Sequence, residues 1–375
     1  MNLLIVFHSL YSLAGGVDNR LSELEMNLPS HINREYLLFK DEVDLPHKGR
    51  INILKSISIP KFILNEKRKF KYLTYLFGIF NLILRVLKTR KFLKEKKFDT
   101  ILAVDDYFSI ICLIASIGLN IKIVCSVRNN WDSLYDNSMI HLLPDFFYKK
   151  LLPILMNKYS SSIHCVSEEL SEKLNKKYKV KNTKAIYNIF DIEIIKQKAN
   201  EDIDIKGNYF INIGHFNKQK NQKDLIVAYK NLKENHNISE KLILIGDGAN
   251  IIDCKNLVKD FNLEKDVIFL GKQSNPYKYL KRASLYISSS LYEGLPAVFI
   301  ESLILEIPIV SYEFETGSRE LTSNLCSLTP DSLVNQMVYF ISHKNLIHES
   351  ISKGNEIVKN KFEKEVILNK WLELL

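Results

Sequence analysis

The sequence Ser289-Ser290-Leu291-Tyr292-Glu293-Gly294-Leu295-Pro296 follows an apolar, strand-like segment, residues 283–288. Pro296 suits the first turn of a helix, where its missing N–H costs nothing, so we expect a helix to begin beside Glu293. A strand, a turn and a helix in this order are typical of α/β proteins with parallel sheets. The free amides of such a helix attract anions, and ligands of these sheets lie at the carboxyl ends of the strands.

Two carboxylates frame this turn. Glu293 lies in the loop and Glu301 inside the expected helix, eight positions later. A carboxylate accepts two hydroxyl hydrogen bonds well, which suits the diols of a hexose and of a ribose. An ordinary strand-turn-helix with solvated glutamates is the alternative, but carboxylates next to a buried strand need partners. The pattern therefore predicts a sugar-nucleotide site.

The same residues carry a family resemblance. Glu293 and Glu301, together with Pro308 and Gly317-Ser318-Arg319-Glu320, resemble the donor-site signature of glycosyltransferase family 4, the retaining enzymes of the GT-B fold. The resemblance implies an α/β protein of two Rossmann-like, doubly wound parallel-sheet domains that face a central cleft. It also implies that further residues around the turn touch the donor: Gly294, Leu295, Pro296 and Ala297.

A basic loop follows the strand-like residues 209–213. The family usually has an arginine directly after Gly214 and a lysine five residues later, both of which hold the donor diphosphate. Lys220 fits this pattern, whereas His215 occupies the arginine position. An imidazole is neutral for much of the time near pH 7 and has no bidentate fork, so we expect a weaker or pH-sensitive phosphate contact there. Without the glutamate motif, both would be read as exposed loop residues.

A second glycine turn, Gly246-Asp247-Gly248, ends the apolar segment 242–245. The resemblance implies that this turn approaches the nucleotide, and glycine permits a close approach because it lacks a β-carbon. Taken alone, Gly-x-Gly after a strand is explained equally well by simple turn chemistry.

The amino-terminal half is expected to hold the acceptor. Gly15 and Gly16 resemble the family's glycine turn next to the donor phosphates, and Arg128 stands where many relatives carry a histidine near the reacting hydroxyl. An arginine cannot act as a base but can hold a phosphate or the departing diphosphate. Asp105 follows a strand-like segment and either binds an acceptor sugar or caps the next helix. The candidate acceptor-binding residues are Gly15, Asp105, Asp106, Arg128 and Asn129.

The length and composition favour two domains. The chain has 375 residues and 46% hydrophobic content, enough for two cores. Strand-like runs alternate with helical patterns along the whole chain, which indicates parallel sheets. In the amino-terminal half these runs are 3–7, 36–39, 100–104, 121–126 and 161–166. We place an acceptor-binding domain at 1–190, a polar linker at 191–208 and a nucleotide-sugar-binding domain at 209–355. The helical pattern of 356–375 is expected to cross back onto the first domain.

The positive charge has a local origin. Residues 61–97 hold 12 Lys and Arg against 2 Asp and Glu, whereas the whole chain holds 52 against 43. An aromatic, apolar run at 72–84 lies inside this window and is too short to span a bilayer. A basic amphipathic helix predicts contact with an anionic membrane surface. A helix packed on its own domain is the alternative, and nucleic acid is disfavoured because no recognised motif accompanies the charge.

The remaining features point to a cytoplasmic protein at the inner face of the cell membrane. Five cysteines show no paired spacing, so they predict buried thiols rather than disulfides or a zinc site. The apolar first residues have no basic leader and read as a core strand rather than a signal peptide. The Asp-x-Asp at 202–204 falls in the expected linker and is not read as a metal site.

These expectations combine into one reaction. The resemblance implies retaining transfer, without metal or cofactor, of a hexose or N-acetylhexosamine from a nucleotide sugar, by analogy a UDP-sugar. The expected acceptor is a saccharide, lipid-linked, in the synthesis of a surface polysaccharide such as capsule or lipopolysaccharide. Glu293, Lys220 and Arg128 are the candidate catalytic residues, since charge develops on the leaving diphosphate. Alternatives are a sugar-nucleotide epimerase of the same fold and a membrane scaffold that lost its chemistry.

Overall fold

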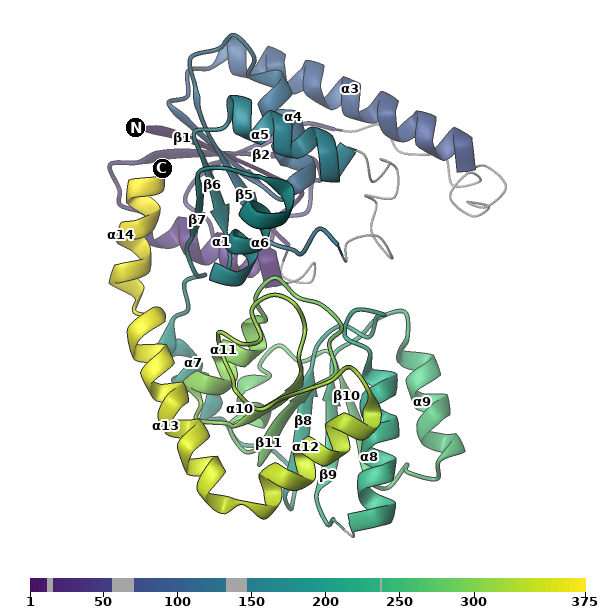
Figure 1. The fold of residues 1–375 in the computed structure, drawn as a ribbon. Helices are drawn as coiled ribbons and strands as arrows, with labels where there is room; N and C mark the ends of the chain where they lie inside the picture. Colours follow the sequence, from purple (N-terminus) through teal and green to yellow (C-terminus); the bar gives the residue numbers. More distant parts are fainter. Residues whose placement is uncertain (12–15, 56–70, 133–146, 237) are drawn as a thin grey trace. The chain divides into compact units, whose positions relative to one another are not determined.

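The computed structural model describes residues 1–11, 16–55, 71–132, 147–236 and 238–375, in two compact units (Figure 1). Unit 1 comprises Met1–Phe190 and Lys364–Leu375, and unit 2 comprises Asp191–Glu363. Each unit is built on a sheet whose described strand pairs are all parallel. The expected α/β fold with two parallel-sheet domains is therefore confirmed.

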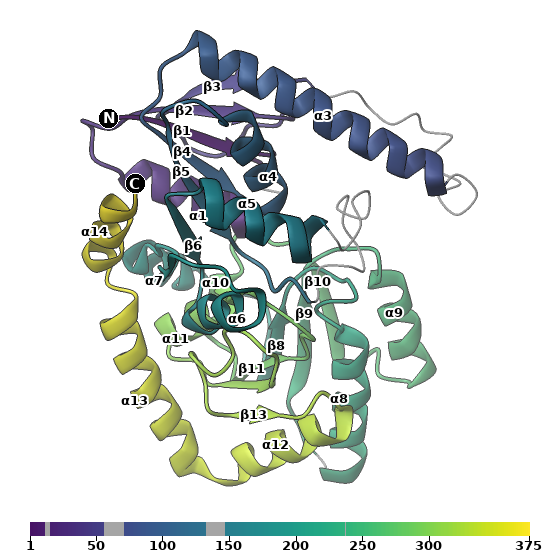
Figure 2. The same ribbon diagram turned by 45° about the horizontal axis from the view of Figure 1, so that its top comes forward.

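Unit 1 has a seven-stranded sheet in the order β3-β2-β1-β4-β5-β6-β7. Its strands are β1 (Asn2–Phe7), β2 (Asn33–Leu38), β3 (Arg50–Ile53), β4 (Thr100–Val104), β5 (Lys122–Val127), β6 (Ser162–Cys165) and β7 (Thr183–Ala185). In β1 the side chains of Leu3 through Val6 are fully buried. A central parallel strand is covered on both faces, which explains its continuous apolar run. Figure 2 shows β1, β2 and β3 side by side.

The chain of unit 1 leaves the centre of the sheet in two directions. From β1 it winds toward β3, and from β4 it winds toward β7, so the topological switch point lies between β1 and β4. Right-handed crossovers place α1 and α4 on opposite faces of the sheet. The helices are α1 (Gly16–Asn27), α3 (Lys71–Glu95), α4 (Asp106–Ala115), η2 (Phe147–Leu151), α5 (Leu152–Tyr159), α6 (Glu168–Tyr178) and α14 (Lys364–Leu374).

The carboxyl-terminal segment forms two helices where a single one was expected. Helix α13 (Lys344–Lys361) ends at Phe362, whose side chain is fully buried, and α14 begins two residues later. Helix α14 belongs to unit 1, where the Trp371 ring packs on His164 with ring centroids 4.3 Å apart. The chain end is held there as well, because Thr100 Oγ1 donates to the Leu375 carbonyl at 2.9 Å.

Unit 2 has a six-stranded sheet in the order β10-β9-β8-β11-β12-β13. Its strands are β8 (Tyr209–Ile213), β9 (Lys241–Ile245), β10 (Val267–Gly271), β11 (Leu285–Ser288), β12 (Ile309–Tyr312) and β13 (Leu325–Cys326). Its helices are α7 (Ile192–Ala199), α8 (Gln222–His236), α9 (Ile251–Asp260), α10 (Tyr277–Leu280), α11 (Ala297–Ile304), α12 (Pro330–Ser342) and α13. One core joins the sheet to α8 and α12 through residues such as Leu225, Leu244 and Leu333, all fully buried.

The segment expected to be a linker, residues 191–208, contains a packed helix. Asp191 caps α7, because its side chain accepts a hydrogen bond from the Ile194 amide. The end of α7 is held by unit 2, since Asn275 Nδ2 donates to the Lys198 carbonyl at 2.8 Å. This segment therefore groups with unit 2.

The five cysteines are free thiols, four buried and Cys326 partly buried, as their spacing predicts. Among the helices within the described ranges, none is long and apolar enough to cross a membrane.

Candidate functional site

The topological switch point of unit 2 brings two predicted loops together. Strands β8 and β11 are neighbours, although α8, β9, α9, β10 and α10 separate them in the chain. Residues 214–221 follow β8, and residues 289–296 follow β11. Both loops leave the carboxyl ends of their strands at the point where the strand order reverses, which is where open parallel sheets bind ligands.

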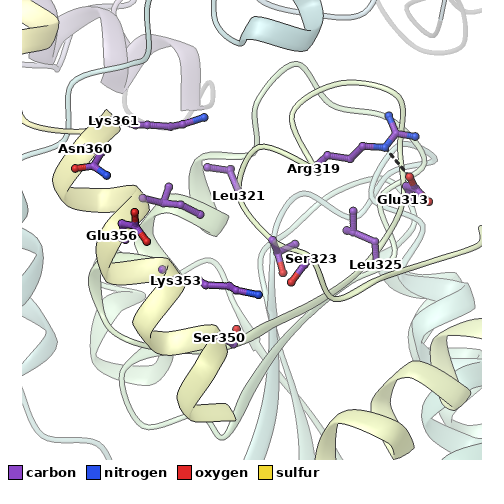
Figure 3. Close-up of a pocket in the computed structure, with 13 residues that line it drawn as sticks. Glu313, Arg319, Leu321, Ser323, Leu325, Ser350, Lys353, Glu356, Asn360 and Lys361 are labelled. Atoms are coloured by element: carbon purple, nitrogen blue, oxygen red, sulfur yellow. Dashed lines mark hydrogen bonds and ion pairs between the residues drawn. The ribbon is translucent and has the colours of Figure 1, made fainter. Parts of the chain in front are cut away.

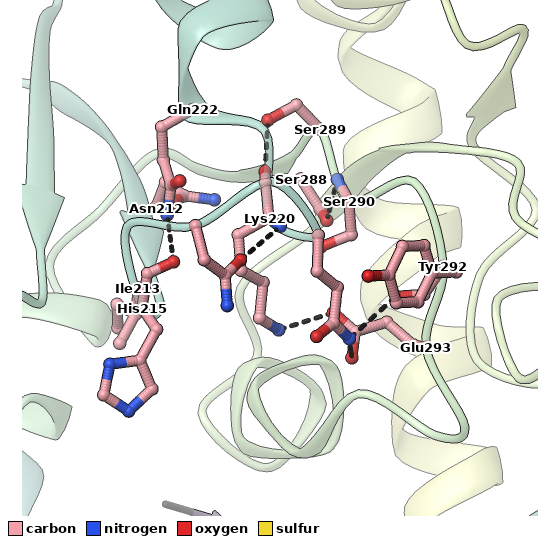
Figure 4. Close-up of polar contacts among 12 residues, drawn as sticks. Asn212, Ile213, His215, Lys220, Gln222, Ser288, Ser289, Ser290, Tyr292 and Glu293 are labelled. Atoms are coloured by element: carbon pink, nitrogen blue, oxygen red, sulfur yellow. Dashed lines mark hydrogen bonds and ion pairs between the residues drawn. The ribbon is translucent and has the colours of Figure 1, made fainter. Parts of the chain in front are cut away.

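Lys220 and Glu293 form an ion pair between these loops (Figure 4). Lys220 Nζ lies 2.5 Å from Glu293 Oε1, and Gln219 Nε2 donates to Glu293 Oε2 at 3.0 Å. The Glu293 side chain is 10% exposed and that of Lys220 21% exposed. Each carboxylate oxygen is thus oriented by one protein donor, and each keeps a further lone pair for a ligand.

Further hydrogen bonds fix one loop on the other. Gln219 Nε2 also donates to the Tyr292 carbonyl at 2.9 Å, and the Gln219 carbonyl accepts from the Leu291 amide at 2.8 Å. Ser289 Oγ lies 2.9 Å from the Lys220 carbonyl oxygen. The Lys220–Glu293 pair therefore stands on a rigid support, which keeps the two side chains positioned before a ligand arrives.

Glycines let a third loop approach closely. Gly246 has φ +142°, and a Cβ there would lie 2.0 Å from the Gly214 carbonyl oxygen. A Cβ on Gly248, at φ +153°, would lie 2.5 Å from the Phe216 carbonyl oxygen. The requirement for glycine is thus already explained by packing against the loop after β8. The contact of Gly246 and Gly248 with a nucleotide stays a prediction.

His215 lies at the exposed rim of the site. Its Nδ1 is 3.0 Å from the Asp247 carbonyl oxygen and therefore carries a hydrogen, because a carbonyl only accepts. Its own carbonyl accepts from Gln222 Nε2 at 3.0 Å. In Figure 4 the imidazole lies apart from the Lys220–Glu293 pair.

Helix α11 places Glu301 in the same region. The residue that caps α11 is Pro296, which provides no side-chain hydrogen bond to the first amides of the helix. Glu301 is 8% exposed, and Tyr277 Oη lies 3.4 Å from its Oε1. Burial raises the pKa of Tyr286, and the charges of Glu293 and Glu301 raise it further. Both carboxylates therefore act on one buried tyrosine, which locates them around a common site.

Thr316 and the Gly-Ser-Arg-Glu motif that follows it lie against the Glu293 loop. The Thr316 hydroxyl donates to the Glu293 carbonyl. Gly317 has φ +84°, and a Cβ there would lie 2.8 Å from the Gly294 carbonyl oxygen. Arg319 Nε pairs with a Glu313 carboxylate oxygen at 2.6 Å. The motif thus contributes to the shape of the loop.

A pocket of about 700 Å³ lies beyond this motif, between residues 313–325 and helix α13 (Figure 3). Its polar lining includes Arg319, Ser323, Ser350, Lys353 and Asn360. Glu293, Glu301 and Lys220 do not line it. Sequence reasoning missed this pocket because, apart from Arg319 of the motif, its walls come from segments that carry no motif.

A second polar cluster lies at the switch point of unit 1, where β1 and β4 end. Arg128 is 5% exposed and donates through Nε to Ser126 Oγ at 3.2 Å and through one terminal nitrogen to Asn188 Oδ1 at 3.1 Å. The charges of Asp105 and Asp18 also act on Arg128 and favour its ionised form. Burial outweighs them and lowers the pKa of Arg128 to about 10. Two of the five N–H groups of the guanidinium thus have internal partners, and the contact of Arg128 with the acceptor or the leaving diphosphate stays a prediction.

His164 extends this cluster and was missed by sequence reasoning, because nothing marks a lone histidine in a strand. It is fully buried, and its Nε2 lies 2.8 Å from the Ile186 carbonyl, so Nε2 carries the hydrogen. Its Nδ1 then accepts from the Ser126 hydroxyl at 2.8 Å. Burial and the charge of Arg128 lower the pKa of His164 to about 3, so the ring is neutral at pH 7.

The other predicted acceptor residues surround this cluster unevenly. Asp105 and Asn129 are half-buried, whereas Asp106 is buried on α4. Gly16 is exposed at the start of α1, where a Cβ would meet no heavy atom within 4 Å. Gly15 lies outside the described residues.

The sequence and the fold are similar to those of known glycosyltransferases. Residues 193–328 match the family model described as "Glycosyl transferases group 1". The chain is 31% identical over 290 residues to an uncharacterized glycosyltransferase of Methanocaldococcus jannaschii, over 73% of this chain and 68% of that protein.

Two further similarities concern a named transferase and a solved structure. This chain is 35% identical to N-acetylgalactosamine-N,N'-diacetylbacillosaminyl-diphospho-undecaprenol 4-alpha-N-acetylgalactosaminyltransferase of Campylobacter jejuni. The similarity extends over 198 residues, which are 53% of this chain and 50% of that protein. The fold is similar to Anabaena HepE in complex with UDP, with a TM-score of 0.75 and 17% identity over 100% of this chain and 99% of that one.

Proposed function

Because the chain belongs to the group 1 glycosyltransferases, we propose that it moves a hexose or N-acetylhexosamine from a nucleoside diphosphate sugar to a lipid-linked saccharide, in the synthesis of a surface polysaccharide. The observation that carries this proposal is the Lys220–Glu293 pair at the switch point of unit 2. An epimerase of the same fold is not favoured, since the matched relatives are transferases.

The pair suits the two ends of an activated sugar. Glu293, oriented by Lys220 and Gln219, keeps lone pairs that accept hydrogen bonds from sugar hydroxyls. Lys220 supplies positive charge for the diphosphate, and the first amides of α11 add hydrogen-bond donors. Glu301, whose charge acts on Tyr286 together with that of Glu293, accepts from the ribose hydroxyls. UDP is the proposed nucleotide, in keeping with the UDP complex of the similar fold.

Transfer replaces one C–O bond by another. The bond between the anomeric carbon and the diphosphate oxygen breaks, the acceptor oxygen bonds to that carbon on the same face, and the acceptor proton passes to the leaving diphosphate. Negative charge develops on the diphosphate, and Lys220 stabilises it, assisted by His215. We propose that these protein groups suffice without a metal ion. Retention of anomeric configuration follows from attack on the face that the leaving group occupies.

The surface of α3 suits an anionic membrane, at which a lipid-linked acceptor would be found. Among the side chains of α3 that the structure describes, five large apolar ones are exposed at alternating three- and four-residue spacing, which places them on one face: Leu73 (39% exposed), Leu76 (63%), Phe80 (51%), Ile83 (51%) and Leu87 (58%). Lys91 and Lys94 continue this face and are exposed. An apolar face that ends in lysines matches the interface of an anionic bilayer. We therefore place the protein at the cytoplasmic face of the cell membrane.

Nucleotide binding and transfer test the proposed reaction. UDP and a panel of UDP-sugars should raise the melting temperature of the purified protein. Labelled UDP-N-acetylgalactosamine should then yield a labelled glycolipid only when an undecaprenol-linked saccharide is added. Conversion of the donor sugar to its epimer without acceptor would support the epimerase instead, and the lack of any response to nucleotides would contradict both.

Flotation with phosphatidylglycerol vesicles tests the membrane surface. The wild-type protein should float with the vesicles at low salt, and Phe80→Asp should abolish flotation. Ile252→Asp is the matched control, because Ile252 is an exposed apolar residue of α9 in unit 2, 67% exposed. Equal flotation of the Phe80→Asp and control variants would exclude α3 as the contact.

A further inference from the structure

Gln219 precedes Lys220 in the loop after β8, and its side-chain amide has a fixed orientation. Its Nε2 donates to Glu293 Oε2 at 3.0 Å and to the Tyr292 carbonyl oxygen at 2.9 Å (Figure 4). Both partners are acceptor oxygens, so the NH₂ group, with its two hydrogens, must face them. The amide therefore cannot be flipped, and its Oε1 is left as a separate hydrogen-bond acceptor.

The backbone around Gln219 is held as firmly as the side chain. The Gln219 carbonyl accepts from the Leu291 amide at 2.8 Å, and the next amide, that of Lys220, donates to Asn217 Oδ1 at 2.9 Å. A side chain that is anchored at both its backbone and its tip loses little freedom when a ligand binds. The Oε1 atom is thus positioned before a ligand arrives.

The Oε1 atom of Gln219 is available to a ligand. None of the described residues donates a hydrogen bond to it, and it is not enclosed, so it reaches the solvent. It shares a carbon with Nε2, and Nε2 contacts Glu293 Oε2. Gln219 Oε1 and Glu293 Oε2 are therefore neighbouring acceptors, which match two neighbouring donors of a ligand.

The chemistry of the atom decides which part of a nucleotide sugar it suits. An amide oxygen is neutral and only accepts, so it binds hydroxyl groups rather than phosphate oxygens. The phosphates are left to Lys220, whose ammonium has three hydrogens and directs one of them at Glu293. A hexose carries hydroxyls on adjacent carbons and so offers two neighbouring donors.

On the basis of the proposed function, we propose that Gln219 is a further donor-binding residue, whose Oε1 accepts a hydrogen bond from a sugar hydroxyl next to the one that Glu293 holds. The same side chain positions Glu293 through Nε2, so one residue sets both the carboxylate and the acceptor beside it. A site built to accept a hydroxyl hydrogen bond discriminates against the analogue that lacks this hydroxyl. Gln219 thereby contributes to the choice of sugar.

Binding of deoxy sugars tests this contact. The purified protein is titrated with UDP-glucose, UDP-galactose and their N-acetyl derivatives, and then with analogues of the tightest-binding sugar in which one ring hydroxyl at a time is replaced by hydrogen. The wild-type protein should lose affinity about three- to tenfold for the analogue that lacks the hydroxyl facing Gln219, as expected for a neutral hydrogen bond.

Gln219→Met keeps the length of the side chain without an acceptor, so it should bind this analogue and the parent sugar equally well. The analogue that lacks the hydroxyl held by Glu293 should bind more weakly than the parent sugar to both proteins. Gln219→Ala, which adds no bulk, should show the same loss of discrimination as Gln219→Met.

The response to UDP alone separates this contact from damage to the fold. UDP carries no sugar, so the UDP-induced thermal shift should be the same in the wild-type protein and both Gln219 variants. Gln336→Met is the matched control, because Gln336 is a partly buried glutamine of α12. It should discriminate among the analogues as the wild-type protein does.

Two results separate this inference from the proposed function. If Gln219→Met and Gln219→Ala discriminate against every deoxy analogue as strongly as the wild-type protein, the inference is overturned, while the proposed function stands because the sugars still bind. If the wild-type protein binds neither UDP nor any of these UDP-sugars, the proposed function fails and the role of Gln219 fails with it.

Discussion

Replacing Glu293 by glutamine tests the donor site most directly. The substitution keeps the size of the side chain but removes its charge. Lys220 Nζ and Gln219 Nε2 each donate to a separate carboxylate oxygen, at 2.5 and 3.0 Å. An amide has one oxygen and one NH₂ group, so one of these two donors must face an NH₂ group whichever way the amide turns. Glu293→Gln therefore disturbs the support of the site as well as its charge.

The size of the effect follows from the hydrogen bonds that are lost. A hydrogen bond to a charged group contributes roughly 1.5 to 3 kcal/mol, and a neutral one roughly 0.5 to 1.5 kcal/mol. Two bonds from sugar hydroxyls to the carboxylate, replaced by one to an amide, remove about 2 to 5 kcal/mol. This corresponds to a loss of about 30- to 5,000-fold in kcat/KM. Because the ion pair is partly exposed, the free energy of unfolding should fall by only about 1 to 2 kcal/mol.

Transfer of radiolabelled sugar, measured together with urea unfolding, separates the two effects. Glu306→Gln is the control, since Glu306 is an exposed glutamate just beyond α11, the helix that follows the Glu293 loop. Its kcat/KM should match that of the wild-type protein. If Glu293→Gln retained kcat/KM within threefold while remaining folded, Glu293 would not bind the donor sugar.

Three further predictions concern other positions. Gly246→Ala would place a Cβ 2.0 Å from a backbone oxygen, so it should abolish the UDP-induced thermal shift. Gly207→Ala is the control, because its Cβ would meet no atom within 4 Å, and it should lower the free energy of unfolding by only about 1 to 2 kcal/mol. Equal UDP-induced thermal shifts of the two variants would contradict this prediction. Burial and, second, the charge of Asp105 raise the pKa of Asp106 from 3.8 to about 8. The folded protein therefore binds a proton that the unfolded chain releases, and the free energy of unfolding falls as the pH rises from about 4 to 8. Asp106→Asn should flatten this decline in urea unfolding curves, and an unchanged slope would refute the cause. Trp371→Ala should lower the free energy of unfolding by about 3 to 5 kcal/mol, because the ring is 1% exposed, and a loss below about 1 kcal/mol would show that α14 is not held by this residue.

Much of the fold could be predicted because parallel strands are buried on both faces and therefore appear as apolar runs. The expected strand at 100–104 coincides with β4, and the strands near Leu3 and Ile121 lie within one residue of β1 and β5. The strands that sequence reasoning missed, β3 and β7, lie at the two edges of the unit 1 sheet. They are short and only partly buried or exposed, so they carry no apolar run.

The donor site could be predicted as a set of residues because its motifs are local. Lys220 and Glu293 lie in loops that follow two strands, and Glu301 lies in the helix after the second loop. The carboxyl ends of parallel strands meet at one edge of a sheet. The ion pair between Lys220 and Glu293 could not be foreseen, because it joins residues 73 positions apart through loops whose shape depends on each other. The sequence also does not reveal that Asp105 has a φ of 73°, a conformation that side chains rarely adopt.

The order of apolar runs, glycines and carboxylates along the chain was enough to determine two parallel α/β units and the glycosyltransferase family. Only the tertiary structure decided that Arg128 is surrounded by internal partners, that His164 lies neutral beneath Trp371, and that Asp105 rather than Asp106 is accessible. The physical reason is that hydrophobic periodicity is a property of neighbouring residues, whereas burial and charge depend on segments that meet only after folding.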